Sequence, residues 1–510
     1  MEYGNEDDVN RAIPILETIV DLQDQDPSHA TYGIWAYFYE ESIEEMAMPD
    51  WNMADFNGKQ LVLTLKKHMK RLPHQTVDRI KHAIHCACEA IIKRNVGPGY
   101  TNICVMGALI TLAGGELLDN RTFVEYGVKR LEALLELTTR MNAYVEYNSS
   151  HYAMITADEL DTIRTIVDNA DALRIADALY HFTWNSIGKH YHARTGQWSG
   201  PHSRSYVTLL HPDCQEYHFI ERGTKEAYKD AGFTRCPEDL LSLFVTEEQR
   251  YFKSESLDEA YSGYQNIATT YVTEEFALGS FSNDFMWNQR RNLIAYVDNN
   301  GRAAYVQLRF LNEGKDFCSA VFAGVQDHAD VLFGLNLATD NGAWHPNLDK
   351  IDGKFTTGDL RLRLEIGGYI EGVSWSMEQD KYDVSVSIGN QILRLKQLAA
   401  VSEWDEPQLQ ISKEDGLVCV DYVFYNGEKR CFNFHDLEQA AWSYLCTLSK
   451  QPEYLQPRAH ISGDFLVAAM TAVNGNEFSI SLKLKPDLTE KLFKTNISSA
   501  SVIKKESKQS

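Results

Sequence analysis

The spacing of apolar residues changes near residue 265, and no other feature of this sequence constrains its fold as strongly. Before that point apolar side chains recur every three or four residues, as in the stripe formed by Leu61, Leu65 and Met69. After it, segments such as 361–370 alternate between apolar and polar residues, which is typical of strands. The sequence therefore predicts a helical half followed by a β half.

Capping and turn signals refine this division. Asn120 is placed to cap a long amphipathic helix, and repeated helices joined by short polar loops favour a helical array or toroid. Asn300-Gly301, Asn426-Gly427 and Asn474-Gly475 lie where hairpin turns are expected, which favours antiparallel sheets packed as a sandwich. We expect an α+β chain of two domains, with an (α/α) toroid over residues 1–265, an antiparallel β-sandwich over 266–500, and a polar tail at 501–510.

The charge balance excludes some partners. The 510 residues include 49 Lys and Arg against 72 Asp and Glu, a formal net charge of −23. This argues against a general nucleic-acid binder, which needs a cationic surface, and against adsorption to anionic membranes. No run of eighteen apolar residues is present, so we expect no membrane span. The acidic start does not resemble a secretory signal and the nine cysteines are scattered, so we expect a cytoplasmic protein unless a leader has been removed.

A polar loop at residues 145–154 lies between two predicted helices. Loops held by a rigid scaffold are where binding and catalytic residues are often placed, and this one presents an amide and an imidazole together. The alternative is an ordinary connection in which Asn and Ser serve as turn residues. Its candidate site residues are Glu146, Tyr147, Asn148, His151 and Tyr152.

A second loop, at residues 189–206, is rich in histidine, arginine and aromatic residues. Glycines and a proline end the preceding helix, and Trp198 could supply a flat face for a sugar ring. The alternative is that the aromatic residues close an edge of the core. His190, His192 and His202 could bind zinc, but no Asp, Glu or Cys has the usual ligand spacing, so we expect no metal. The other candidates here are Arg204 and Tyr206.

A third group lies in the β half. Arg290 and Arg291 are adjacent and could bind a carboxylate in a bidentate manner. The alternative is that these residues end strands and pair with the acidic excess. The remaining candidate substrate-binding residues are Gln289, Trp344 and His345.

A helical half carrying an E-Y-N-S loop and a G-P-H-S-R-x-Y loop, followed by a β-sandwich half, resembles polysaccharide lyases of the heparinase II/III and alginate-lyase type. The resemblance implies β-elimination next to a uronic-acid carboxylate, without a cofactor. It further implies that Asn148 neutralises that carboxylate, and that His202 or His151 is the base or its helper. Tyr206 would be the acid, or both acid and base, and Arg204 would lower its pKa by proximity.

Two other functions remain open from the residues alone. A glycoside hydrolase on the same toroid would need two carboxylates across the bond to be cleaved, for which Glu146 with Asp158 or Glu159 could serve. A non-catalytic carbohydrate-binding protein would instead use tryptophans as platforms. In each case we expect a saccharide or an anionic small molecule, held in a local basic pocket of an acidic protein.

Overall fold

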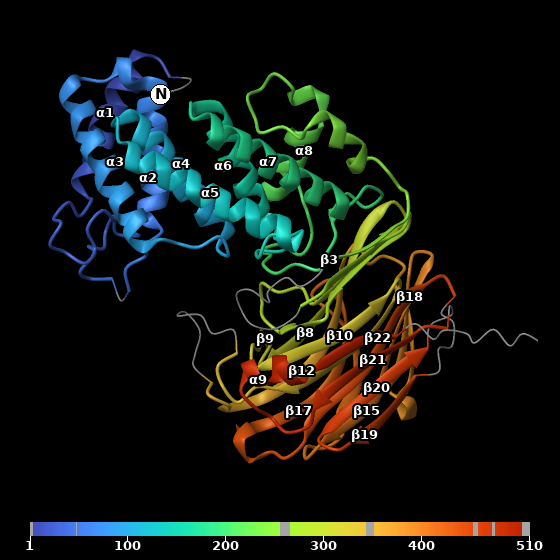
Figure 1. The fold of residues 1–510 in the computed structure, drawn as a ribbon. Coiled ribbons are helices and arrows are strands. Elements are labelled where there is room, and N and C mark those ends of the chain that lie inside the picture. The colour runs from blue at the N-terminus through green and yellow to red at the C-terminus, as the bar shows by residue number, and fades with distance from the viewer. Residues whose placement is uncertain are drawn as a thin grey trace, which may run out of the picture. The chain divides into compact units, whose positions relative to one another are not determined.

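The computed structural model describes residues 4–46, 48–254, 266–342, 351–451, 457–471 and 475–501. Helices form the first half of the chain and antiparallel sheets the second, so the predicted fold class is confirmed (Figure 1). Two compact units are present, and neither is one continuous segment. The helical unit comprises Met1–Glu146, Tyr152–Ser186 and Arg222–Pro237, and the β unit comprises Tyr147–His151, Ile187–Glu221 and Glu238–Ser510.

The long helices follow one another along the first half of the chain. They are α1 (Glu6–Asp21), α2 (Met53–His68), α3 (His74–Arg94), α4 (Thr101–Leu117), α5 (Arg121–Met141), α6 (Ser150–Ile166), α7 (Ala170–His190) and α8 (Gln215–Thr224), with α9 (Thr489–Thr495) near the C-terminus. Short 3₁₀ helices lie at Met69–Arg71, Glu226–Tyr228, Glu238–Phe244, Gln379–Lys381 and Phe434–Asp436. Within the described residues, no helix is both long and apolar enough to cross a membrane.

Helix α4 is the centre of the helical unit. It is apolar on every side, and nearly all its residues are buried, as expected for a helix surrounded by others. It packs against α2, α3 and α5. Gly107 allows α5 to approach closely, since a Cβ there would lie only 2.9 Å from Cζ of the buried Arg130. The predicted cap of α5 is confirmed, because the side chain of Asn120 accepts a hydrogen bond from the Phe123 backbone N–H at 3.3 Å.

The described residues of the β unit form a two-stranded ribbon and three larger antiparallel sheets. The ribbon pairs β1 (Tyr191–His192) with β2 (Gln197–Trp198). The seven-stranded sheet has the order β13 (Ser374–Glu378), β14 (Asp383–Ile388), β15 (Gln391–Ser402), β18 (Ala440–Ser449), β11 (Asp330–Leu337), β10 (Ala320–Asp327) and β6 (Asn283–Phe285). The nine-stranded sheet has the order β16 (Gln408–Glu414), β17 (Leu417–Asn433), β12 (Lys354–Gly368), β8 (Arg302–Asn312), β7 (Leu293–Asn299), β5 (Phe276–Phe281), β4 (Ala268–Val272) and β3 (Arg250–Ser254), with β9 (Lys315–Asp316) paired to β8. The four-stranded sheet has the order β19 (Arg458–Ser462), β20 (Phe465–Thr471), β21 (Glu477–Lys483) and β22 (Ile497–Ser501).

The two largest sheets share one hydrophobic core. Alternate residues of β12, such as Leu362 and Leu364, contribute to it from the nine-stranded sheet, and Val384 and Val386 of β14 contribute from the seven-stranded sheet. This period of two places one face of each sheet inward, which is the packing of a β-sandwich. The sandwich predicted from the alternating pattern is therefore confirmed.

The Asn-Gly turn predictions have different outcomes. Asn300 and Gly301 connect β7 to β8 and both have positive φ angles, of 55° and 82°, as a tight hairpin turn requires. Asn426-Gly427 is not a turn: it lies inside β17, where Asn426 pairs with Asp359 of β12 across an irregularity in the register. The long ladder with β12 thus outweighs the local turn preference. Asn474 lies outside the described residues.

Candidate active site

Asn148 joins the two predicted loops. Its Nδ2 donates to the carbonyl oxygens of Ser199 and Pro201 at 2.8 and 2.9 Å, and its Oδ1 accepts from Nε1 of Trp198 at 2.7 Å. Asn148 is buried and has a φ angle of 46°, a left-handed conformation that Asn tolerates better than most residues. Both amide hydrogens are therefore engaged by the protein, and the side chain holds the loop at 147–151 against the loop at 198–201.

His202 is buried in contact with Asn148. Its Nδ1 is 2.6 Å from the carbonyl oxygen of Asn148, and only 2% of the residue is exposed. Burial lowers the pKa of His202 to about 4, so the neutral ring donates Nδ1–H to that carbonyl. His192 is also buried, with Nε2 3.0 Å from the Thr273 carbonyl oxygen, and burial lowers its pKa to about 4. Within the described ranges, no three His, Cys, Asp or Glu side chains are grouped to hold a metal ion.

The buried His202 predicts a specific dependence of stability on pH. Its pKa is about 4 when folded and about 6.5 when unfolded, so the unfolded chain binds more protons between these values. The free energy of unfolding should therefore fall by about 2 kcal/mol between about pH 7 and pH 5 because of this group. Chemical denaturation at both pH values measures the change. In His202→Gln the loss should be smaller by about that amount, and an equal loss in both proteins would contradict the assignment.

Trp198 and Tyr147 are also buried beneath the two loops. Trp198 is 2% exposed, so it is not the open sugar platform considered from the sequence. The hydroxyl of Tyr147 lies 3.0 Å from Nε2 of His190, and burial raises the pKa of Tyr147 to about 12. These buried side chains support the loops and do not present polar groups to solvent.

The accessible part of the loops presents a different set of side chains. Nδ1 of His151 lies 3.0 Å from Oε1 of Glu216, and the His151 ring meets the Tyr206 ring edge-on with centroids 5.0 Å apart. Tyr206 is 50% exposed. Nη2 of Arg204 donates to the Tyr206 hydroxyl at 3.2 Å. An imidazole, a phenol and a guanidinium therefore lie side by side, and we call Glu216, His151, Tyr206, Arg204 and Gln289 the rim cluster.

Gln289 extends the rim cluster from the β half. Its Oε1 accepts from Nε of Arg204 at 3.0 Å, and its backbone oxygen accepts from Ser205 N–H at 2.8 Å. The Arg204 guanidinium also lies 5.8 Å from the centre of the Trp287 ring. With Oε1 occupied by Arg204, the Nε2 amide is turned away from it, and the described residues supply no acceptor for Nε2.

Glu216 determines the tautomer of His151. Burial raises the pKa of Glu216. The hydrogen bond from His151 and backbone hydrogen bonding lower it by more than burial raises it, so the net pKa lies below the ordinary value. The ionised carboxylate accepts Nδ1–H, so in the neutral form of the imidazole the lone pair lies on Nε2. Glu216 could not be identified from the sequence. It follows His151 by 65 residues on α8, and no local pattern connects the two.

Arg290 and Arg291 do not form a paired carboxylate site. Nη1 of Arg290 lies 3.3 Å from Oδ2 of the buried Asp284. Arg291 is 5% exposed, and its Nη2 donates to the Ser205 carbonyl and to Oγ1 of Thr208, both at 3.4 Å. The two guanidinium groups are thus turned to different protein partners, and Arg291 helps to hold the loop that carries the rim cluster.

The carboxylates considered for a hydrolase lie in the helical unit with partners of their own. Glu146 accepts from the backbone N–H and the Nδ2 of Asn102 at 2.9 and 2.8 Å. Glu159 is buried 2.5 Å from Nζ of Lys59, and burial raises the pKa of Asp158. Tyr152 is half-buried on α6. Trp344 and His345 lie outside the described residues.

Comparisons with known proteins give one family model and several solved structures. Residues 1–218 match the model of a domain of unknown function, DUF8769, and no curated protein matches the chain. Heparan sulfate lyase HepC from Pedobacter heparinus is similar in structure, with a TM-score of 0.35 and 8% identity over 92% of this chain and 89% of that chain. The chondroitin AC lyase of Streptomyces coelicolor A3, in complex with chondroitin sulphate, has a TM-score of 0.45 and 8% identity over 93% and 80%. A Paenibacillus xanthan lyase has a TM-score of 0.34 and 10% identity over 93% and 62%.

Proposed function

We propose that this protein is a carbon–oxygen lyase that performs β-elimination on a uronic-acid-containing saccharide. The observation that carries the proposal is the rim cluster, in which an imidazole bonded to a carboxylate lies together with a phenol hydroxyl, a guanidinium and a carboxamide. Elimination makes three chemical demands: the substrate carboxylate must be neutralised, the adjacent proton must be removed, and the departing oxygen must be protonated. Each demand has a candidate in the rim cluster.

His151 is the proposed base. Because Glu216 accepts Nδ1–H, Nε2 is the ring nitrogen that would take the proton from the carbon next to the substrate carboxylate. The electron pair of that C–H bond then forms the new carbon–carbon double bond as the neighbouring carbon–oxygen bond breaks. The developing imidazolium is stabilised by the adjacent Glu216 carboxylate, since opposite charges favour the charged form of each group.

Tyr206 is the proposed acid. A tyrosine hydroxyl is ordinarily protonated at neutral pH, so it can donate its proton to the departing glycosidic oxygen. Nη2 of Arg204 donates to the same hydroxyl oxygen, which stabilises the phenolate that remains. Proton transfer from His151 back to Tyr206, directly or through water, would restore both groups for the next turnover.

Gln289 and Arg204 are the proposed carboxylate-binding groups. The Nε2 amide of Gln289 can donate to one oxygen of the substrate carboxylate, while its Oε1 is oriented by Arg204. Asn148 was expected to act in this way, but its two amide hydrogens are bound to Ser199 and Pro201. Gln289 is therefore the better candidate for binding the substrate carboxylate, and Asn148 holds the two loops together.

The test is to incubate the full chain with uronate-containing polymers and oligosaccharides of several linkages. Elimination creates a conjugated double bond, so we expect ultraviolet absorbance to rise with time. Mass spectrometry provides an independent check, because the products of elimination sum to the mass of the substrate, whereas hydrolysis adds one water. Products heavier by one water, or no turnover of any uronate substrate, would overturn the proposal.

A further inference from the structure

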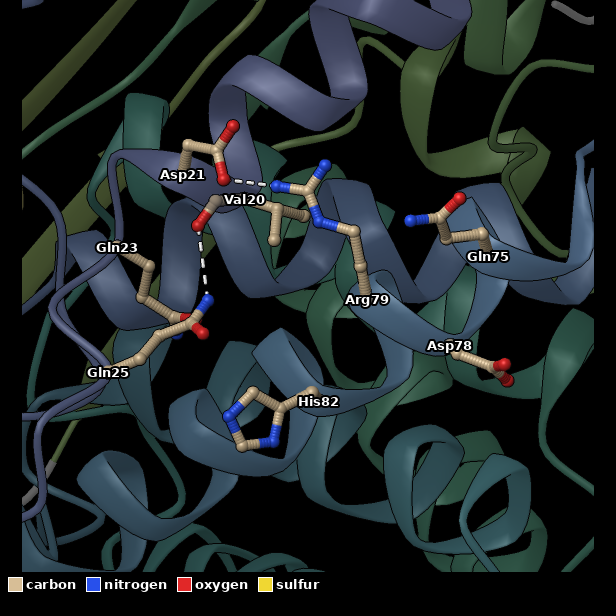
Figure 2. Close-up of a pocket in the computed structure, with 8 residues that line it drawn as sticks. All are labelled: Val20, Asp21, Gln23, Gln25, Gln75, Asp78, Arg79 and His82. Carbon is tan, nitrogen blue, oxygen red and sulfur yellow. Dashed lines mark hydrogen bonds and ion pairs between the residues drawn. The ribbon is translucent and has the colours of Figure 1, made fainter.

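The helical unit contains a pocket of about 640 Å³ that the elimination proposed above does not use (Figure 2). It lies where the end of α1 and the segment that follows meet the first half of α3. Seven polar side chains and one apolar side chain surround it. They are Val20, Asp21, Gln23, Gln25, Gln75, Asp78, Arg79 and His82.

One face of α3 lines this pocket. Gln75, Asp78, Arg79 and His82 are spaced at i, i+3, i+4 and i+7, so they lie on the same side of the helix. Gln75, Asp78 and His82 are exposed, whereas the residues of the opposite face are buried in the helical core. The polar face is thus directed toward the pocket and is not required for packing.

The floor of the pocket is held by hydrogen bonds. Gln23 is 6% exposed, and its Nε2 donates to the carbonyl oxygens of Gly33 and Ala83 at 3.1 and 3.0 Å. Nε2 of Gln25 donates to the Val20 carbonyl at 3.1 Å and to Oε1 of Gln23 at 3.3 Å. These bonds fix the segment after α1, so the pocket is largely preformed.

The polar groups around the opening have unused hydrogen-bonding capacity. Among the residues that the structure describes, no hydrogen-bond partner is present for the Gln75 carboxamide or the Asp78 carboxylate. Nε2 of His82 has one weak contact, with Sγ of Cys86 at 3.8 Å. The opening therefore offers both donors and acceptors to a ligand.

The charges around the pocket restrict the class of ligand. Arg79 forms an ion pair with Asp21 (Figure 2), so its charge is already compensated. Asp78 adds a further negative charge, which disfavours anions such as uronates. A ligand whose groups each donate and accept hydrogen bonds, without a charge, matches the mixed set of side chains. We propose that this pocket binds a neutral polyhydroxylated ligand, an uncharged sugar, at a site separate from the rim cluster.

Calorimetric titration of the full chain tests this proposal, with maltose and cellobiose as neutral probes, glucuronic acid as the anionic probe and putrescine as the cationic probe. We expect at least one disaccharide to bind. Glucuronic acid should bind more weakly because Asp78 repels it, and putrescine should bind more weakly because Asp21 is already paired with Arg79, which leaves Asp78 alone to compensate two positive charges. Gln75→Ala and Asp78→Ala should each weaken that binding roughly tenfold, the effect of losing about 1.4 kcal/mol of hydrogen bonding. Both side chains are exposed, so both variants should fold.

Two controls separate this site from others. Asp171→Ala removes an exposed aspartate of α7 that does not line the pocket, and it should leave disaccharide binding unchanged. Tyr206→Phe should also retain binding, because Tyr206 is not among the residues that line the pocket. Binding of neither disaccharide, preferential binding of glucuronic acid or putrescine, or binding unaffected by Gln75→Ala and Asp78→Ala would each overturn the proposal.

Discussion

Replacing Tyr206 by phenylalanine is expected to lower kcat for elimination by a factor of roughly 10² to 10⁴, the usual contribution of general acid catalysis. The variant loses only the hydroxyl that protonates the departing oxygen, while the ring contact with His151 remains possible. KM should change little, since the interaction is made in the transition state. Initial rates of ultraviolet absorbance at several substrate concentrations give both constants.

The control for this variant is Tyr39→Phe. Tyr39 is 74% exposed and is not part of the rim cluster, so removing its hydroxyl should leave kcat at the wild-type value. Because Tyr206 is itself half exposed, Tyr206→Phe should unfold at the same denaturant concentration as the wild-type protein. If Tyr206→Phe kept most of the wild-type kcat, Tyr206 would not be the acid.

Replacing Asn148 by alanine is expected to lower the free energy of unfolding by about 4 kcal/mol. Three hydrogen bonds are lost, and the buried partner groups of Ser199, Pro201 and Trp198 are left unsatisfied, at about 1–3 kcal/mol each. The left-handed backbone at Asn148 adds roughly 1 kcal/mol for a residue with a Cβ and no polar side chain. Chemical denaturation followed by tryptophan fluorescence measures the loss.

Asn142→Ala provides a matched control for the backbone contribution. Asn142 has a similar φ angle of 50° at the end of α5, but its side chain is exposed. We expect that variant to lose only about 1 kcal/mol. If Asn148→Ala were no less stable than Asn142→Ala and yet lost elimination, Asn148 would act on the substrate and not as a support for the loops.

The predictable parts of the fold are those with a local physical cause. A helix or strand packs one face against the core, so apolar residues recur at the period of that element in the sequence. Leu61 and Leu65 show this for a helix, and Leu362 and Leu364 for a strand. Asn120 caps its helix and Asn300-Gly301 makes its turn through bonds and angles within a few residues. Asn426-Gly427 was predicted wrongly because its conformation depends on a partner strand far away in the sequence.

The candidate site could be predicted only as a pair of loops. Both loops are polar and rich in His, Arg and Tyr, and they do meet, through Asn148 and Trp198. Which side chains would be buried was not visible in the sequence. His202 and Trp198 turned inward, whereas Tyr206 is half exposed, because each loop packs against elements that the local sequence does not specify.

By itself, the sequence determined the order of helices and strands, the sandwich class of the β half and the two loops on which polar chemistry is concentrated. These follow from short-range periodicity and turn chemistry. Only the tertiary structure decided that Glu216 bonds His151, that Gln289 bonds Arg204 and that Arg204 bonds Tyr206. It also decided that Asn148 and His202 are buried and bonded to each other. The physical reason is that hydrogen bonds and burial depend on distance in space, and Glu216 and Gln289 reach the loops from residues far along the chain.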